Sequence, residues 1–280
     1  WAFSLLVLSS ACGESFFNAE IELPTPEHDP VLAISSFITS TDTTLLAAKI
    51  TRTYGLFEDR PNDDRLFDAK VELYEDGTLL YEFEPVDLLD VNYRQLIPEA
   101  FGGIGKSYEL KVSHPDYPTA AGTQVMPIPV PLSTYEFREV EGNDLDGSNG
   151  ELKITFKDPA GEENYYEFLA VQVCSYTYID YYTGEEFTQE YEQTIYFDTE
   201  TNMDPNIEMG FAYDAVLIKD QNFNGQTFTY SPRFYLCQDD YYDPSPSQDR
   251  KFRIHWRSVS KEYYNYSKSL RDNLNATDNP

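Results

Sequence analysis

Short runs in which apolar and polar residues alternate follow one another along most of the chain. Residues 69–74 alternate, residues 75–78 form a turn sequence that contains Asp-Gly, and residues 79–84 alternate again. An Asp-Gly pair between two alternating runs is typical of a β-hairpin. Similar runs, separated by turn residues, recur up to Trp256. Many short strands at regular spacing are typical of sandwiches and barrels, so the pattern predicts an all-β fold.

One segment near the middle of the chain divides this series of strands. Residues 126–131 read Met-Pro-Ile-Pro-Val-Pro. Prolines in alternation cannot donate to a β-ladder, so residues 127–131 are predicted to be a connector between two domains. We expect residues 31–126 to form an Ig-like β-sandwich, and residues 132–275 to form a second β-sandwich or barrel.

The last part of the chain changes period. Tyr263, Tyr266, Leu270 and Leu274 are spaced three and four residues apart, and Ser260 precedes them as a helix cap. The spacing predicts one amphipathic helix over residues 260–274, packed on the second β-domain.

The first residues indicate export and lipidation. Residues 1–11 begin with an apolar run and end in small residues before Cys12, as in a signal peptide remnant followed by a lipobox. Ser9 stands where a lipobox usually has Leu. We expect Cys12 to be acylated and residues 12–30, which are acidic and rich in proline, to be the lipidated tether. The alternatives are an ordinary secretory signal and a buried first strand.

The charge of the chain limits its partners. The 280 residues include 20 basic and 49 acidic ones, for a formal net charge of −29, so nucleic acid is excluded as a partner by repulsion from its phosphates. No apolar run reaches the roughly 18 residues of a spanning helix, which excludes a polytopic membrane protein.

Cys174 and Cys237 each lie in a strand-like run. Disulfides persist in exported proteins, so the two cysteines pair if their strands are neighbours. Two buried thiols are the equally supported alternative.

Two loops carry oxygen side chains at alternate positions, as the first half of a calcium loop does. They contain Asp220, Asn222 and Asn224 in one case, and Asp144, Asp146 and Ser148 in the other. The first loop has Ser231 where a calcium loop needs a bidentate Glu, and the second has no Gly at its sixth position. We therefore favour polar turns at both places and expect no metal.

A different acidic loop combines carboxylates with aromatic rings. It contains Asp239, Asp240, Tyr241 and Tyr242 and is bounded by proline. Such a set can stack on sugars and bind their hydroxyls, which makes it a candidate ligand rim. A solvated loop is the favoured alternative.

The residues offer little support for catalysis or for a cofactor. His28, His114 and His255 are scattered, and neither a Gly-x-Ser-x-Gly elbow nor a His-Glu-x-x-His helix is present. Residues 100–107 resemble a P-loop, but the alternation of residues 107–113 favours a glycine turn that leads into a strand. We expect no catalytic residue and no cofactor.

Motifs over about residues 12–275 come in an order that resembles a known family. They are Cys12 with its tether, Gly105-Lys106-Ser107-Tyr108, Lys157-Asp158-Pro159, Glu163-Asn164-Tyr165-Tyr166, residues 220–226, and Ser258-Val-Ser260-Lys-Glu-Tyr-Tyr264. The chain resembles Bacteroidetes lipoproteins of the domain-of-unknown-function family numbered 4249.

This resemblance implies an outer-membrane lipoprotein, often encoded beside a SusC-like TonB-dependent transporter, and it implies no catalytic residues. We favour the cell surface over the inner leaflet for it, although the sequence leaves the leaflet open. We therefore expect a non-enzymatic accessory or ligand-capture partner of such a β-barrel transporter. A surface adhesion or structural protein is the alternative. A glycan-processing enzyme with a carboxylate pair is a weaker one.

Overall fold

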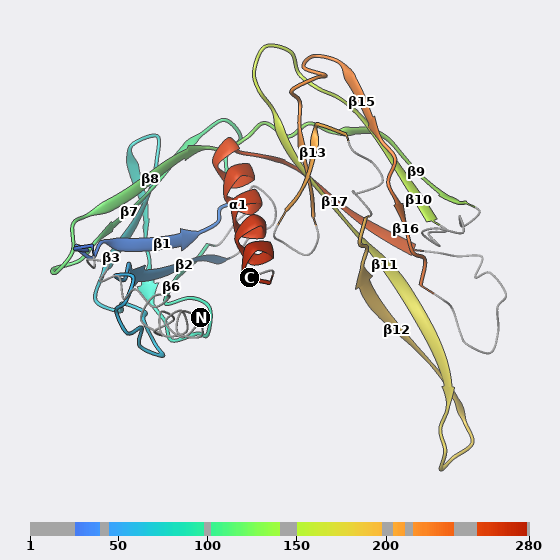
Figure 1. Ribbon diagram of the computed structural model, residues 1–280, viewed down its shortest axis with the longest axis horizontal. Helices are drawn as coiled ribbons and strands as arrows, with labels where there is room; N and C mark the ends of the chain where they lie inside the picture. The colour runs from blue at the N-terminus through green and yellow to red at the C-terminus, as the bar shows by residue number, and fades with distance from the viewer. Residues whose placement is uncertain are drawn as a thin grey trace, which may run out of the picture.

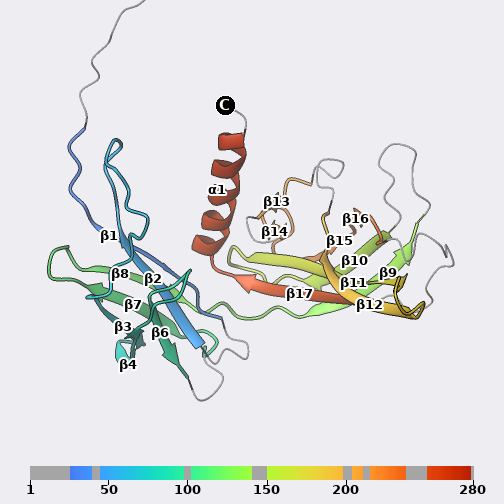
Figure 2. The ribbon, with the colours of Figure 1, turned by 90° about the horizontal axis from the view of Figure 1, so that it is seen from below.

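The computed structural model describes residues 26–39, 45–97, 102–140, 150–197, 204–210, 215–237 and 251–278. These residues form two lobes of antiparallel β-sheet with one helix between them (Figures 1 and 2). The expected all-β fold with a single C-terminal helix is confirmed. Within the described residues there is no helix with the length and apolar character needed to cross a bilayer.

The N-terminal lobe, β1–β8, consists of two four-stranded sheets. The strand order of one sheet is β1 (Leu32–Ser36), β2 (Leu45–Arg52), β6 (Tyr93–Leu96), β5 (Glu84–Pro85). The order of the other is β4 (Thr78–Glu82), β3 (Lys70–Glu75), β7 (Ser107–Ser113), β8 (Ala120–Val125). When β1 to β8 are lettered A, B, C, C′, D, E, F and G in chain order, the two sheets have the orders A-B-E-D and C′-C-F-G. These are the orders of an immunoglobulin-like sandwich.

The two sheets of this lobe bury one apolar cluster between them. Ile50 from the first sheet and Val71, Leu73 and Val112 from the second have no exposed surface. Tyr108 lies near the start of β7, and its hydroxyl accepts a hydrogen bond from the Gly103 backbone N–H at 2.8 Å. A tyrosine that bonds the backbone a few residues upstream is a known corner of immunoglobulin-like folds.

The glycine-rich segment before β7 is a turn, as the alternation predicted. The strand begins at Ser107, directly after Lys106, where a P-loop would begin a helix. The Lys106 ammonium pairs with Asp76 at 2.5 Å.

The C-terminal lobe, β9–β17 with α1, also consists of two sheets. One contains β9 (Leu132–Glu139), β10 (Gly150–Lys157), β15 (Thr227–Tyr230) and β16 (Arg233–Phe234). The other contains β11 (Tyr165–Ile179), β12 (Glu186–Thr194), β13 (Ile207–Met209), β14 (Val216–Lys219) and β17 (Lys251–Val259).

The core of the C-terminal lobe is largely aromatic. Phe156 of β10 packs against Tyr166 of β11 and Trp256 of β17, with ring centroids 4.7 Å and 4.6 Å away. Phe168 stacks on Phe197 at 5.1 Å. Because inward residues of both sheets share one buried cluster, the sheets pack face to face.

The segment between the lobes is held at both ends. Met126 N–H donates to the Lys106 carbonyl at 2.9 Å, which fixes that end to β7. Val130 N–H donates to Ser258 Oγ at 3.0 Å, and its carbonyl accepts from Trp256 Nε1 at 2.6 Å. Only residues 127–129 therefore lie between the two attachments.

The helix α1 (Lys261–Asp278) is four residues longer at its C-terminal end than the predicted 260–274. Residues 275–278 contain no large apolar side chain, so the apolar spacing could not reveal them. Ser260 Oγ accepts from Tyr263 N–H at 3.1 Å, which is the expected N-cap. Tyr263 Oη donates to the buried Glu167 of β11 at 2.8 Å. Phe37 of the N-terminal lobe contacts the same helix, with its ring 6.0 Å from that of Tyr263.

Candidate functional site

The longest hairpin of the protein extends away from the body of the C-terminal lobe (Figure 1). Residues 165–173 of β11 pair with β17, whereas residues 171–179 pair with β12. Beyond Val173, β12 is the single strand paired with β11 in the described part of the chain. We call this two-stranded projection, residues 174–191, the arm.

The tip of the arm is a closed turn. Asp180 Oδ1 accepts hydrogen bonds from the backbone N–H groups of Tyr182 at 2.9 Å and Thr183 at 2.8 Å. These bonds from Thr183 and Tyr182 lower the pKa of Asp180, so the carboxylate stays ionised and keeps the turn closed. Gly184 completes the turn at a φ of +68°, which a glycine adopts without strain.

Two tyrosines of this turn extend into solvent. Tyr181 and Tyr182 are each 93% exposed and pack edge to face, with ring centroids 5.6 Å apart. Ile179 beside them is 69% exposed. Farther down the arm, Tyr178 stacks on Phe187, its cross-strand neighbour, at 5.7 Å. Exposed aromatic and apolar side chains gathered at one end of a hairpin are typical of an interaction site.

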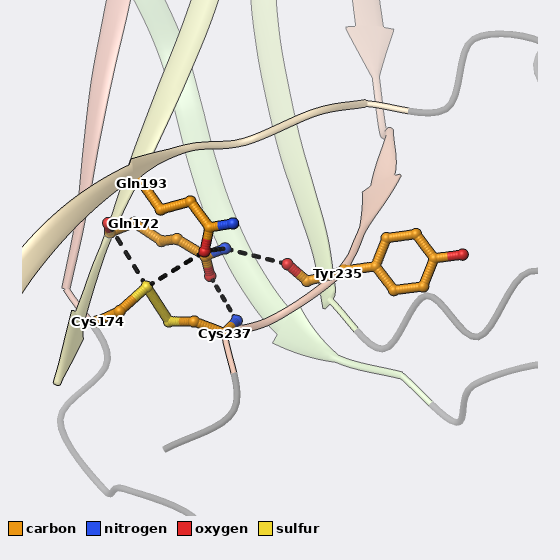
Figure 3. Close-up of a disulfide and its surroundings, with 5 residues drawn as sticks. All are labelled: Gln172, Cys174, Gln193, Tyr235 and Cys237. Atoms are coloured by element: carbon orange, nitrogen blue, oxygen red, sulfur yellow. Dashed lines mark hydrogen bonds between the residues drawn. A yellow bond between two sulfur atoms is a disulfide. The ribbon is translucent and has the colours of Figure 1, made fainter. Parts of the chain in front are cut away.

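The root of the arm is braced by a disulfide between Cys174 and Cys237, whose Cα atoms are 5.9 Å apart (Figure 3). The amide nitrogen and the amide oxygen of the buried Gln172 both form hydrogen bonds beside this disulfide. Gln172 Nε2 donates to the Tyr235 carbonyl, and its Oε1 accepts from Cys237 N–H, each at 3.1 Å. The arm therefore extends from a covalently fixed base, and of the two alternatives for these cysteines the structure has the bonded one.

Sequence reasoning passed over the tip of the arm. The sequence carried one indication, because residues 165–182 form an aromatic run much longer than the usual five or six residues of a strand. A run of that length cannot be covered entirely by the rest of a domain of this size. Its end, followed by Thr-Gly, is where exposed aromatic residues should have been sought.

The Asp220 loop does not bring its three predicted oxygen ligands together. Asp220 lies at the centre, and its Oδ2 accepts from Asn224 Nδ2 at 3.2 Å and from Asn164 N–H at 2.9 Å. Asn222 is directed elsewhere, since its Nδ2 donates to Asn206 at 3.1 Å. In the described part of the chain no group of three or more His, Cys, Asp or Glu side chains is placed to hold a metal.

Asp220 and Asp158 form a buried acidic pair, each about 1% exposed. Asp158 is well supplied with donors, from the Tyr166 hydroxyl and from Gly225 N–H at 2.8 Å. Asp220 Oδ1, in contrast, has no hydrogen-bond partner among the described residues. Burial, together with repulsion from Asp158, raises the pKa of Asp220, although the bond from Asn164 opposes this.

The substitution Asp220→Asn should raise the melting temperature more at pH 7 than at pH 4. A carboxyl with a raised folded-state pKa is protonated at little cost in acid, and its ionisation destabilises the fold as pH rises through that pKa. Asn removes the charge and keeps an oxygen that can accept from Asn164 N–H and Asn224 Nδ2. Differential scanning fluorimetry at both pH values measures the change.

Glu151→Gln is the matched control, with the opposite trend. Hydrogen bonds from Arg138 lower the pKa of Glu151, so its ionisation stabilises the fold above the unfolded-state pKa, and this stability is lost in acid. Gln should therefore cost more stability at pH 7 than at pH 4. Equal effects of Asp220→Asn at both pH values would contradict the assignment.

A shallow pocket of about 230 Å³ on the β9–β10 sheet contains two carboxylates, Glu136 and Glu151. Glu151 is held by Arg138 at 2.7 Å and by Ser231 at 2.9 Å. A general acid needs a raised pKa, whereas that of Glu151 is lowered by Arg138, so Glu151 does not suit the role of general acid.

The three histidines lie on separate elements. His28 contacts Thr53 at 3.0 Å, and His255 lies on β17. His114 Nε2 lies 2.7 Å from Asp68, and its Nδ1 accepts from Asp116 N–H at 3.0 Å. Both nitrogens of His114 are thus used to hold a loop.

Other predicted sites lie outside the described residues. They are the lipidation site Cys12, the loop with Asp144, Asp146 and Ser148, and the ligand rim of Asp239, Asp240, Tyr241 and Tyr242.

The fold and the arm together define a class: a two-lobed β-protein with an immunoglobulin-like first lobe and an aromatic hairpin on the second. The chain belongs to the family described as Domain of unknown function (DUF4249), whose profile matches residues 18–280. No curated protein and no solved structure that was compared with the chain matches it.

Proposed function

We propose that the protein is a non-enzymatic lipoprotein of the outer membrane that binds a β-barrel transporter of the SusC-like, TonB-dependent kind. Cys12 carries the lipid anchor, and the arm makes the contact with the transporter. The observation that carries this proposal is the pair of 93% exposed tyrosines, Tyr181 and Tyr182, at the end of a braced hairpin.

The exposed rings of Tyr181 and Tyr182 are unfavourable in water and favourable in an interface. Leaving apolar ring surface in water is unfavourable, and its removal on binding contributes roughly 25 cal/mol per Å². Tyrosine is enriched among the residues that dominate binding energy at protein interfaces. Because the Asp180 turn and the disulfide fix the tip in advance, little conformational entropy is lost on binding.

The arm is also suited to protein recognition by its charge. Glu186 and Glu190 lie on β12, and Lys251 reaches Glu190 at 3.4 Å from β17. Charged residues at the rim of an aromatic patch affect association rate and partner choice more than affinity. Glu186, opposite Ile179 next to the aromatic tip, favours a partner surface with a basic group beside an apolar centre.

The double substitution Tyr181→Ser/Tyr182→Ser tests the contact. Affinity purification of the full-length protein from native outer membranes should recover a β-barrel transporter, and the double variant should recover at least about tenfold less. Both side chains are solvent-exposed, so the melting temperature should not change. Quantitative mass spectrometry of the recovered proteins gives the ratio.

Tyr135→Ser is the matched control, because Tyr135 is 69% exposed on β9, away from the arm. The Tyr135→Ser variant should recover as much of the transporter as the unsubstituted protein does. Cys12→Ala tests the anchor in the same cells, and it should move the protein out of the membrane fraction. Recovery of no outer-membrane barrel by the unsubstituted protein, or its capture by a surface polymer alone, would contradict the proposal.

A further inference from the structure

The β8 strand is the outer strand of the second sheet of the N-terminal lobe, and no described strand pairs with its far side. The residue after β8, Met126, shows how the backbone is oriented. Its N–H donates to the Lys106 carbonyl and its carbonyl accepts from Gly105 N–H, so both of its polar groups face β7. Successive residues of a strand face opposite edges. Ala121, Thr123 and Val125 therefore direct their N–H and C=O groups outward.

This edge carries no charged side chain. Its sequence is Ala-Ala-Gly-Thr-Gln-Val, and five of its six residues are exposed, Val125 at 55%. Two longer outer strands carry acids, namely Glu186, Glu190 and Glu192 on β12 and Glu136 and Glu139 on β9, whereas the shorter outer strands β1 and β15 carry no charge either. Charge on an edge strand opposes pairing with another chain. In a protein of net charge −29, an edge of this length without charge is notable.

The face of β8 that turns toward the sandwich interior is also open. Gly122 lies opposite Leu110 in the register with β7, and no atom lies within 4 Å of the position of a Cβ added to it. A side chain from another strand can therefore occupy the space at Gly122 without displacing any described residue.

We infer that β8 is a homodimer interface, in which it pairs antiparallel with β8 of a second copy about a twofold axis at Thr123. In this register Thr123 lies opposite Thr123, and Ala121 lies opposite Val125 of the other copy. All three outward residues of each chain then donate and accept, which gives six backbone hydrogen bonds. Gln124 of one copy lies opposite Gly122 of the other, over the open position.

In this register the side chains that lie opposite each other in the two copies are also compatible. Cross-strand threonine pairs are favourable, and no like charges are placed opposite each other. The nearest acid on β7, Glu109, lies opposite Thr123 within its own sheet. The two copies of Glu109 are thus separated by three strand spacings, about 14 Å, which exceeds the Debye length of about 8 Å at physiological ionic strength.

The whole-molecule charge gives the interface a salt dependence. Two chains of net charge −29 repel each other at long range, and salt screens this repulsion while leaving backbone hydrogen bonds intact. The dimer fraction should therefore rise with ionic strength. This inference is independent of the proposed transporter partner, because β8 and the arm lie on different lobes.

Thr123→Cys tests the register in intact membranes. Opposed residues in a hydrogen-bonded antiparallel pair have Cα atoms about 5.5 Å apart, within the range that a disulfide spans. Oxidation by copper phenanthroline should give a non-reduced band at twice the mass of the monomer band seen under reducing conditions. Thr134→Cys, on the exposed and charged strand β9, is the matched control and should stay monomeric, as should the unsubstituted chain.

Thr123→Pro removes the central outward donor, and an edge strand tolerates proline where its N–H faces solvent. Sedimentation velocity of the detergent-extracted protein should show dimers for the unsubstituted chain and for Thr123→Val, increasing with salt, and monomers for Thr123→Pro. Circular dichroism checks that the variant is folded. Monomers of the unsubstituted chain at every salt concentration, no Thr123→Cys dimer, or a Thr123→Cys adduct with a different protein would each overturn the inference.

Discussion

Loss of the Cys174–Cys237 disulfide is expected to destabilise the C-terminal lobe by about 4 kcal/mol. The bond joins residues 63 positions apart, and the chain-entropy relation for a loop of that size gives this value. The bond also supports the two hydrogen bonds by which Gln172 of β11 holds Tyr235 and Cys237, the residues that follow β16. Urea denaturation of Cys174→Ala/Cys237→Ala against the unsubstituted protein measures the difference.

A reducing agent supplies the control for that measurement. Dithiothreitol should lower the unfolding midpoint of the unsubstituted protein to that of the double variant and leave the variant unchanged. The aromatic tip should lose partner binding as well, because its base is no longer fixed. Equal stability with and without the bond would contradict the expected stabilisation.

The substitution Asn92→Ala is expected to destabilise the N-terminal lobe by about 3 kcal/mol. Asn92 is fully buried, and its side chain accepts from Ile50 N–H at 2.7 Å. Its Nδ2 donates to the carbonyls of Ile50 at 2.9 Å and Leu66 at 2.5 Å. Truncation leaves these buried backbone groups unsatisfied, at about 1–3 kcal/mol for a donor left without a partner. For a lobe of about 100 residues this lowers the melting temperature by more than about 10 °C, which calorimetry resolves.

Asn62→Ala is the comparison for Asn92, because Asn62 lies exposed in a loop of the same lobe. The melting temperature of the Asn62→Ala variant should differ from that of the unsubstituted protein by less than about 2 °C. Similar melting temperatures for the two variants would contradict the assigned role of Asn92.

Much of the architecture could be predicted from local sequence. Alternation and the Asp-Gly turn identify β3 and β4, and the prolines at 127–131 separate the two sets of sheets because proline cannot join a ladder. The helix start could be located from Ser260, whereas its end could not, since its last turn carries no large apolar residue.

The candidate site was less accessible to such reasoning. Whether Cys174 and Cys237 meet depends on how β16 returns to β11, which is a long-range property of topology. The same holds for Asp158 and Asp220, which local patterns place in two unrelated turns. Tyr181 and Tyr182 resemble core residues in composition, and only the length by which β11 and β12 exceed their neighbours reveals their exposure.

The short link between the lobes has a mechanical consequence. Residues 127–129 can span about 9 Å at most as an extended proline-rich segment, and the Phe37 contact with α1 gives the lobes a second point of attachment. Two points define a line, so the remaining freedom between the lobes is rotation about that line. A force applied at the end of the hairpin would therefore reach the first lobe as a torque, and the orientation of one lobe would constrain the directions in which the other can swing.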